Sequence, residues 1–401
     1  MAKGCGTTVA SMGSEASTGG GRDRWVDLLR AGSLAVVVLW HWVFTIISWR
    51  ADGPHASNPI GTTRGLWLLT WLLQVMPLFF VVGGSVHARA LQRRPSARSF
   101  IAKRARSLAG GAAVLVALAT WIYLLVDTFW TAPPWLKGSL VLVLSPLWFL
   151  AVYLLLILVA PAAWKAHLRW GELVPIFLAG LAAMVDVARF TWEIPYAEWL
   201  NWLVVFGAAH QTGFFWDRIQ AAPRRFGWIL TWIGLFALIG LTNMRFYPRS
   251  TVGVPGEPFS NLGPPTMVIV ALTCFQVGLV RLIRDRALAL TEAGLPRRFA
   301  DWITANAQAL YLGHAFAYAL VYVAVTELHR RPGTETDLGW WLWRPFWLVV
   351  PALVFLAGFE LSRLLLPSGR SRRRVGPPDD GEVPAIADGE VAHGPQRGHD
   401  A

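Results

Sequence analysis

The stretch RWVDLLRAGSLAVVVLWH, residues 24–41, decides the fold class. After Arg30 it contains ten consecutive residues without a charge, and the apolar run continues to about residue 49. About 20 predominantly apolar residues are enough to cross the roughly 30 Å hydrocarbon core of a bilayer as a helix. The segment therefore predicts a membrane-spanning helix over about residues 27–49. This helix carries a few ionisable groups, and His41 is one of them.

Similar apolar runs recur along the whole chain of 401 residues. Only 15% of the residues are charged, compared with roughly 25% in an average soluble domain, and the 23 tryptophans are typical of the belts at membrane interfaces. This composition excludes a soluble enzyme, a disordered chain and a disulfide scaffold. We expect an all-α, polytopic integral membrane protein of about ten transmembrane helices. The ten expected spans are about 27–49, 65–88, 107–127, 140–163, 172–189, 199–216, 226–243, 263–283, 302–326 and 341–366.

The basic residues predict the orientation of these spans. The segments 89–106, 165–169, 218–225 and 281–298 contain 17 Lys and Arg, whereas the alternate connections contain eight. Cytoplasmic connections carry the excess of Lys and Arg in membrane proteins. The richer set is therefore expected in the cytoplasm, with both chain termini on the same side and the protein in the cell (plasma) membrane.

The ends of the chain differ in composition from the rest. Residues 1–22 are rich in Gly, Ser, Thr and Ala, and residues 369–401 are rich in Pro, Gly, Asp and Arg. Both are expected to be disordered cytoplasmic tails, flanking a single membrane domain over 23–368. The net charge of +12 does not indicate a nucleic-acid partner. The basic residues are distributed among the connections between apolar runs and do not form one continuous basic stripe.

Three histidines lie near the middle of their expected spans: His41, His210 and His314. Ionisable groups inside a membrane span are costly and indicate functional sites. A packed structural role is the alternative for each of them. If all three met, three imidazoles would suit zinc, but their spacing offers no support for that alternative, and no metal is expected.

Arg30 and His41 lie on nearly the same face of the first expected helix. They are eleven residues apart, which brings them to within about 20° of the same direction and separates them by roughly 16 Å along the axis. One helix face thus presents a guanidinium at the cytoplasmic end and an imidazole deep in the membrane. This arrangement suits a long donor with anionic groups at one end and a reacting centre at the other, as in coenzyme A thioesters.

Together with other motifs, this pattern resembles the acyltransferase-3 family of ten-span membrane acyltransferases. The motifs occur in the family's order over about residues 23–366. They are Arg30-x10-His41 with Asp27 before it, PLFFVVGG (77–84), RAR (104–106), PLWFL (146–150) and NAQALYLGH (306–314). Gly83, Gly84 and Ser85 depart from the Ser-Gly-Phe that is common in the family. HQTG (210–213) resembles a feature of one branch, and no role is assigned to it.

The resemblance implies transfer of an acyl group, usually acetyl, from cytoplasmic acyl-coenzyme A to a hydroxyl of an exported or surface glycan or glycolipid. It implies that His41 is the catalytic histidine and Arg30 its partner in the first span, that His314 is a further site residue, and that Arg104 and Arg106 bind the donor. Acyl-coenzyme A would be a substrate, with no permanently bound cofactor, and the partners would be this donor, the acceptor and membrane lipids.

Two features leave other interpretations open. The polar connection 244–262 could contact an external substrate or could be a solvated turn between two spans. The mid-span histidines, with Asp186, Glu360 and the Gly83-Gly84 break, would also suit a proton-coupled transporter, although no inverted repeat is visible between the two halves.

Overall fold

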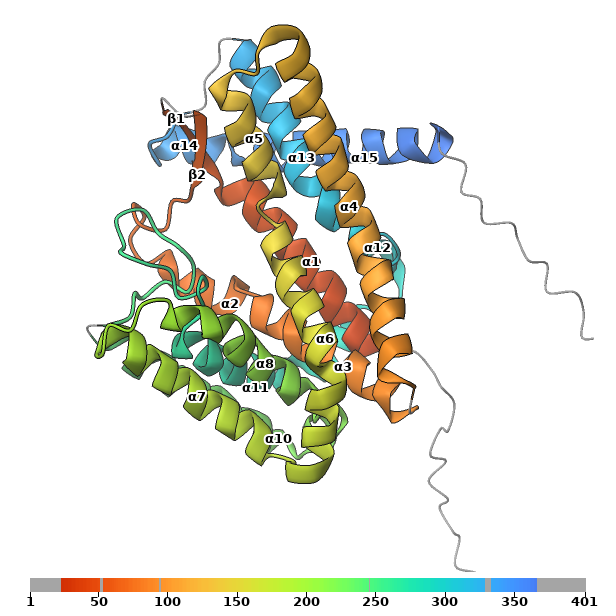
Figure 1. Ribbon diagram of the computed structural model, residues 1–401, viewed down its shortest axis with the longest axis vertical. Coiled ribbons are helices and arrows are strands. Elements are labelled where there is room, and N and C mark those ends of the chain that lie inside the picture. The colour runs from red at the N-terminus through yellow and green to blue at the C-terminus, as the bar shows by residue number, and fades with distance from the viewer. Residues whose placement is uncertain (1–22, 51–52, 94, 245, 329–332, 366–401) are drawn as a thin grey trace, which may run out of the picture. The chain divides into compact units, whose positions relative to one another are not determined.

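A computed structural model describes residues 23–50, 53–93, 95–244, 246–328 and 333–365. The two expected tails, 1–22 and 369–401, lie outside the described residues, and so do residues 366–368 at the end of the expected membrane domain. The chain divides into two compact units, residues 1–358 and 359–401. The second unit is described over residues 359–365 alone, which form the end of one helix, and the first unit carries the architecture shown in Figure 1.

Helices follow one another along the first unit, interrupted by one small antiparallel hairpin, in which Ile46 pairs with Ser57. In chain order the elements are α1 (Arg24–Phe44), β1 (Ile46–Arg50), β2 (Gly53–Ser57), α2 (Trp67–Leu73), α3 (Met76–Gln92), α4 (Ala97–Trp130), α5 (Pro134–Leu144), α6 (Leu147–Trp170), α7 (Leu173–Phe190), the 3-10 helix η1 (Ala197–Leu200), α8 (Asn201–Gly213), α9 (Trp216–Ala221), α10 (Arg224–Asn243), α11 (Met267–Leu290), α12 (Gly294–Ala305), α13 (Ala307–Glu327), α14 (Leu338–Leu342) and α15 (Arg344–Leu365), which continues into the second unit. The all-α class and the multi-pass membrane character are confirmed.

The part of the chain that the structure describes has nine helical segments long and apolar enough to cross a membrane, where the sequence predicts ten. The difference falls on the sixth expected span, 199–216. This stretch is divided among η1, α8 and α9, and the 13 residues of α8 are only about 20 Å long at 1.5 Å per residue. The orientation of the termini stays a prediction.

Three other expected spans have different ends. The first helix stops at Phe44, because Thr45 is extended and the β-branched run that follows enters the hairpin. The expected span 140–163 is two helices that separate at Ser145 and Pro146, where proline lacks the N–H that a continuous helix needs. Helix α4 begins at Ala97, so Arg104 and Arg106 lie on a helix and not in a loop.

Helix α1 is central to the first unit, where it contacts α3, α11, α12 and α13 (Figure 1). The Asp23 carboxylate caps its start by accepting hydrogen bonds from the backbone N–H groups of Trp25 and Val26. Arg89 of α3 also pairs with Asp23 at 2.6 Å and with Asp217 of α9 at 2.7 Å. Burial alone would raise the pKa of Asp23, but the Arg89 guanidinium and the two backbone donors hold it below its usual value. The first turn of α1 is therefore fixed to α3 and α9.

The hydrophobic core lies among α3, α8 and α11. Phe80 of α3 and Phe206 of α8 are fully buried with their ring centroids 4.4 Å apart, and Ile269 and Leu272 of α11 are also fully buried in the same cluster. Two of these helices, α3 and α11, also contact α1.

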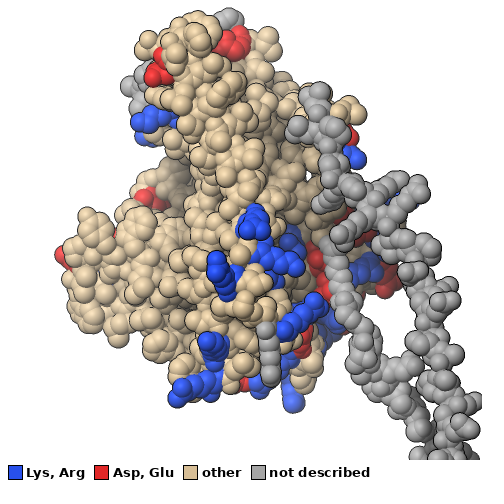
Figure 2. Space-filling view, turned by 45° about the vertical axis from the view of Figure 1, so that its right-hand side comes forward, with Lys and Arg blue, Asp and Glu red and all other residues tan. Residues whose placement is uncertain are grey.

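Charge and apolar surface separate along α4. Arg98, Lys103 and Arg106 are exposed near its start, whereas Trp121 and Phe129 are exposed further along it. Figure 2 shows Lys and Arg gathered on the middle and lower parts of the face in view. Between them and a few charged residues near the top lies a broad surface without Lys, Arg, Asp or Glu. Such a broad apolar surface suits hydrocarbon, and the basic end is the one predicted to be cytoplasmic.

Candidate active site

His41 and His314 form a hydrogen-bonded pair between α1 and α13. The Nδ1 atom of His41 lies 2.8 Å from Nε2 of His314, and the two rings are nearly parallel, with an interplanar angle of 7° and centroids 5.0 Å apart. The side chain of His314 is fully buried. Two histidines that are 273 residues apart in the sequence are thus brought together by packing of the first long helix against a late one.

A backbone carbonyl determines where the protons of this pair reside. His314 Nδ1 lies 2.6 Å from the carbonyl oxygen of Tyr311, and a carbonyl can only accept, so Nδ1 carries the proton. The Nε2 atom of neutral His314 then accepts from Nδ1–H of His41. The remaining nitrogen of His41, Nε2, therefore has a free lone pair, which is what a general base requires.

The end of α1 that carries His41 is fixed on several sides. The indole N–H of Trp42 donates to the His314 carbonyl at 3.0 Å, and Arg344 donates to the Val43 carbonyl at 3.3 Å. The Arg344 guanidinium in turn lies 3.7 Å from the ring centroid of Trp340. The Val43 carbonyl lies in the last turn of α1, where a carbonyl has no partner within its own helix. Together the two contacts restrict the position of the His41 ring.

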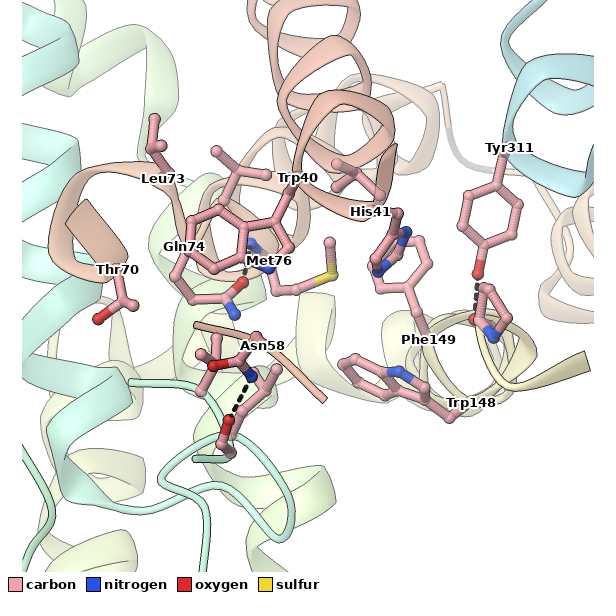
Figure 3. Close-up of a pocket in the computed structure, with 16 residues that line it drawn as sticks. Trp40, His41, Asn58, Thr70, Leu73, Gln74, Met76, Trp148, Phe149 and Tyr311 are labelled. Carbon is pink, nitrogen blue, oxygen red and sulfur yellow. Dashed lines mark hydrogen bonds between the residues drawn. The ribbon is translucent and has the colours of Figure 1, made fainter. Parts of the chain in front are cut away.

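His41 lines a cavity of about 220 Å³ (Figure 3). Its wall combines indole rings with amide and hydroxyl groups. The residues labelled in Figure 3 are Trp40, His41, Asn58, Thr70, Leu73, Gln74, Met76, Trp148, Phe149 and Tyr311. Aromatic faces beside a few polar groups are typical of pockets for small organic ligands.

Two breaks in the helices contribute to the wall of this cavity. One separates α2 from α3 at Gln74 and Val75, and the other separates α5 from α6 at Ser145 and Pro146. The hydroxyl of Tyr311 donates to the Pro146 carbonyl. Irregular backbone within a membrane is tolerated where it lines a cavity and its polar groups find partners. The two breaks therefore indicate a binding site in this region.

The connection between α10 and α11 covers part of the same cavity, through Val252, Gly253 and Leu262. Its shape is held by Asn261, which is fully buried and donates to the carbonyls of Pro248 and Ser250. Of the two interpretations of this segment, the structure favours contact with the site over a merely solvated turn.

Arg30 and Arg104 line a second cavity, of about 430 Å³, together with His87 and Tyr153. Arg30 comes from α1 and Arg104 from α4, where its guanidinium lies 4.1 Å from the ring centroid of Phe100. Phe149 and Tyr311 line both this cavity and the one at His41. The two cavities are therefore neighbours separated by aromatic rings, with the cations of Arg30 and Arg104 on one side and the His41 imidazole on the other.

The structure does not place Arg106 with Arg104. Arg106 is exposed and borders a separate shallow hollow with Ser99 and Lys103. The reason is helical geometry, because residues two apart differ by about 200° in direction. Arg30 and Arg104, which the sequence places in different spans, are the pair that shares a cavity.

His210 does not join His41 and His314. Its Nε2 atom lies 2.9 Å from Nδ1 of His87 instead. Among the described residues, no cluster of three His, Cys, Asp or Glu side chains is positioned to hold a metal ion, so the three-histidine alternative is not assembled here.

Asp186, considered for a proton path, is engaged in a hydrogen-bond network of its own. Its carboxylate accepts hydrogen bonds from Asn201, from the Tyr247 hydroxyl and from the backbone N–H of Met267 at the start of α11. These contacts join α7 to the connection between α10 and α11 and give Asp186 a structural function.

A family model described as an acyltransferase domain, Acyl_transf_3, matches residues 23–362. The chain belongs to this family. It is therefore a multi-pass membrane acyltransferase, and this assignment favours the acyltransferase interpretation over the transporter. Comparison with curated proteins gave no match, and comparison with solved structures gave none either.

The tautomers of the histidine pair are directly measurable. In ¹⁵N-histidine-labelled protein at neutral pH, we expect His41 and His314 to be neutral and protonated at Nδ1, because the Tyr311 carbonyl fixes His314 and His314 fixes His41. Nitrogen NMR distinguishes the two tautomers, and loss of signals in His41→Gln and His314→Gln assigns them. A His41 ring protonated at Nε2 would contradict this arrangement.

Proposed function

We propose that this acyltransferase moves an acyl group, most simply acetyl, from cytoplasmic acyl-coenzyme A to a hydroxyl of an exported or surface glycan or glycolipid in the cell membrane. The observation that carries the proposal is the pair of neighbouring cavities. One contains the unprotonated Nε2 of His41, and the other contains Arg30 and Arg104 without an acidic residue among its described lining residues.

The cationic cavity suits the donor's phosphates. A guanidinium makes charge-assisted, often bidentate hydrogen bonds to phosphate oxygens. With the phosphates between Arg30 and Arg104, the flexible arm of the donor would pass Phe149 and Tyr311 and bring its thioester to His41. The roughly 16 Å between Arg30 and His41 along α1 is the distance that this arm has to cover.

The chemistry at His41 is general base catalysis. Nε2 takes the proton of the acceptor hydroxyl while the oxygen attacks the thioester carbonyl carbon. The carbon–sulfur bond then breaks, the thiolate leaves, and it receives the proton from the His41 imidazolium. Throughout, Nδ1–H of His41 donates to His314, which orients the ring and stabilises its positive charge. His314 acts in this proposal as a positioning residue.

His41→Gln should lower acyl transfer by about 10²–10⁴-fold, the usual contribution of a positioned base, because glutamine cannot accept and return a proton. The assay uses labelled acetyl-coenzyme A with membranes from the expressing cells as the source of acceptor. His167→Gln is the matched control, since His167 of α6 contacts Trp164 and Phe215 outside both cavities. Near-normal transfer by a correctly inserted His41→Gln protein would reject the assignment of the base.

Arg104→Ala should weaken donor binding by about tenfold or more, since a hydrogen bond to a charged group contributes about 1.5–3 kcal/mol. Arg106→Ala, two residues away but outside the cavity, should change it little. The difference between the variants should shrink as salt is added, because ions screen such contacts. Titration with coenzyme A measures both affinities, and equal losses in the two variants would contradict the placement of the donor.

A further inference from the structure

Two glycines bring α3 and α8 into backbone contact. A Cβ atom on Gly84 would lie 1.9 Å from the carbonyl oxygen of His210, and one on Gly213 would lie 1.9 Å from the carbonyl oxygen of Val81. No side chain fits at either position without moving the helices apart. The crossing explains why the segments VVGGSVH (81–87) and HQTG (210–213) need their glycines.

The crossing brings His87 and His210 together. Nδ1 of His87 lies 2.9 Å from Nε2 of His210, and each side chain is only 2% exposed. Aromatic rings enclose His87, with the centroids of Phe100 and Tyr153 at 5.4 and 5.6 Å. Since Nδ1 of His87 is occupied by His210, Nε2 is the ring nitrogen available to the cavity that His87 lines.

The groups that face His87 are cationic or neutral. They are Arg30 from α1, Arg104 from α4, Tyr153 from α6 and His210 from α8. None of the described residues that line this cavity is acidic. By themselves the two guanidinium groups therefore oppose a third positive charge, whereas an anion between them would reverse the sign of the local field.

We propose that the His87–His210 pair is the third component of the anion site and takes up one proton when the donor's phosphates bind between Arg30 and Arg104. This inference rests on the proposed function. The proton comes from solvent and binds Nε2 of His87, which then donates to a phosphate oxygen. Nδ1–H of the same ring donates to His210, which remains neutral. Donor binding is thus coupled to proton uptake at the crossing of α3 and α8, and this uptake is separate from the proton transfer at His41.

Calorimetric titration of the full-length protein with free coenzyme A tests this coupling. Repeating the titration at one pH in buffers of different ionisation enthalpy gives the number of protons taken up. We expect net uptake by the wild type and by His167→Gln, and its loss in His87→Gln. As the pH falls, the affinity of the wild type should rise relative to His87→Gln by up to about tenfold per pH unit, as one linked proton requires. Because both proteins receive the same ligand, titration of the ligand's own phosphates cancels in the comparison.

A second measurement needs no variant. In ¹⁵N-histidine-labelled wild-type protein, addition of coenzyme A should convert one neutral imidazole into an imidazolium. Binding without proton uptake and without a new imidazolium would overturn the role of His87 and His210 while leaving the proposed donor intact. Failure of the wild type to bind coenzyme A at all would instead reject the donor itself.

Discussion

The hydrogen bond between His41 and His314 is the interaction on which the site depends. It orients the imidazole of His41 on α1. His41 is the donor and His314 the acceptor, because the Tyr311 carbonyl fixes the proton of His314 on Nδ1. A charged carboxylate in this position would be costly within a membrane. A neutral histidine backed by a backbone carbonyl provides the same orientation without burying a negative charge.

The architecture around this bond serves to keep polar groups inside the membrane satisfied. Helices that break at Gln74 and at Pro146 form part of the cavity wall, and side chains such as Tyr311 supply the hydrogen bonds that the broken backbone lacks. The connection between α10 and α11 covers part of the same cavity, and the hydrogen bonds of Asn261 hold this connection in shape. The cavity is thus assembled from irregular segments supported by the buried helices α3, α8 and α11.

The lengths of the apolar runs were sufficient to predict most of the fold. Long apolar runs give helices because backbone groups in lipid must bond within their own segment, and the expected spans differ from the observed ones mainly at proline and at β-branched residues. The sixth span was predicted as one helix, since hydropathy does not register the interruption between α8 and α9. The hairpin of β1 and β2 was missed for a similar reason, because β1 continues the apolar run of α1.

The site was predictable where a single helix determines it. The common face of Arg30 and His41 follows from helical geometry alone. Contacts between helices do not follow from such geometry, so the sequence could not decide that His314 meets His41 while His210 meets His87. The separation of Arg104 from Arg106 was within reach, because residues two apart on a helix differ by about 200° in direction, but that requires knowing that α4 begins at Ala97. The glycines at the crossing of α3 and α8 were the available signal for His87.

The central claim of the proposed function is that the donor reaches His41 from the cytoplasmic side. Sealed vesicles of known orientation, prepared from membranes that contain the acceptor, test it with labelled acetyl-coenzyme A added outside the vesicles only. Inverted vesicles, which expose the cytoplasmic face, should transfer the label, whereas right-side-out vesicles should do no better than vesicles that contain the His41→Gln protein. Equal transfer by intact right-side-out vesicles would contradict the claim.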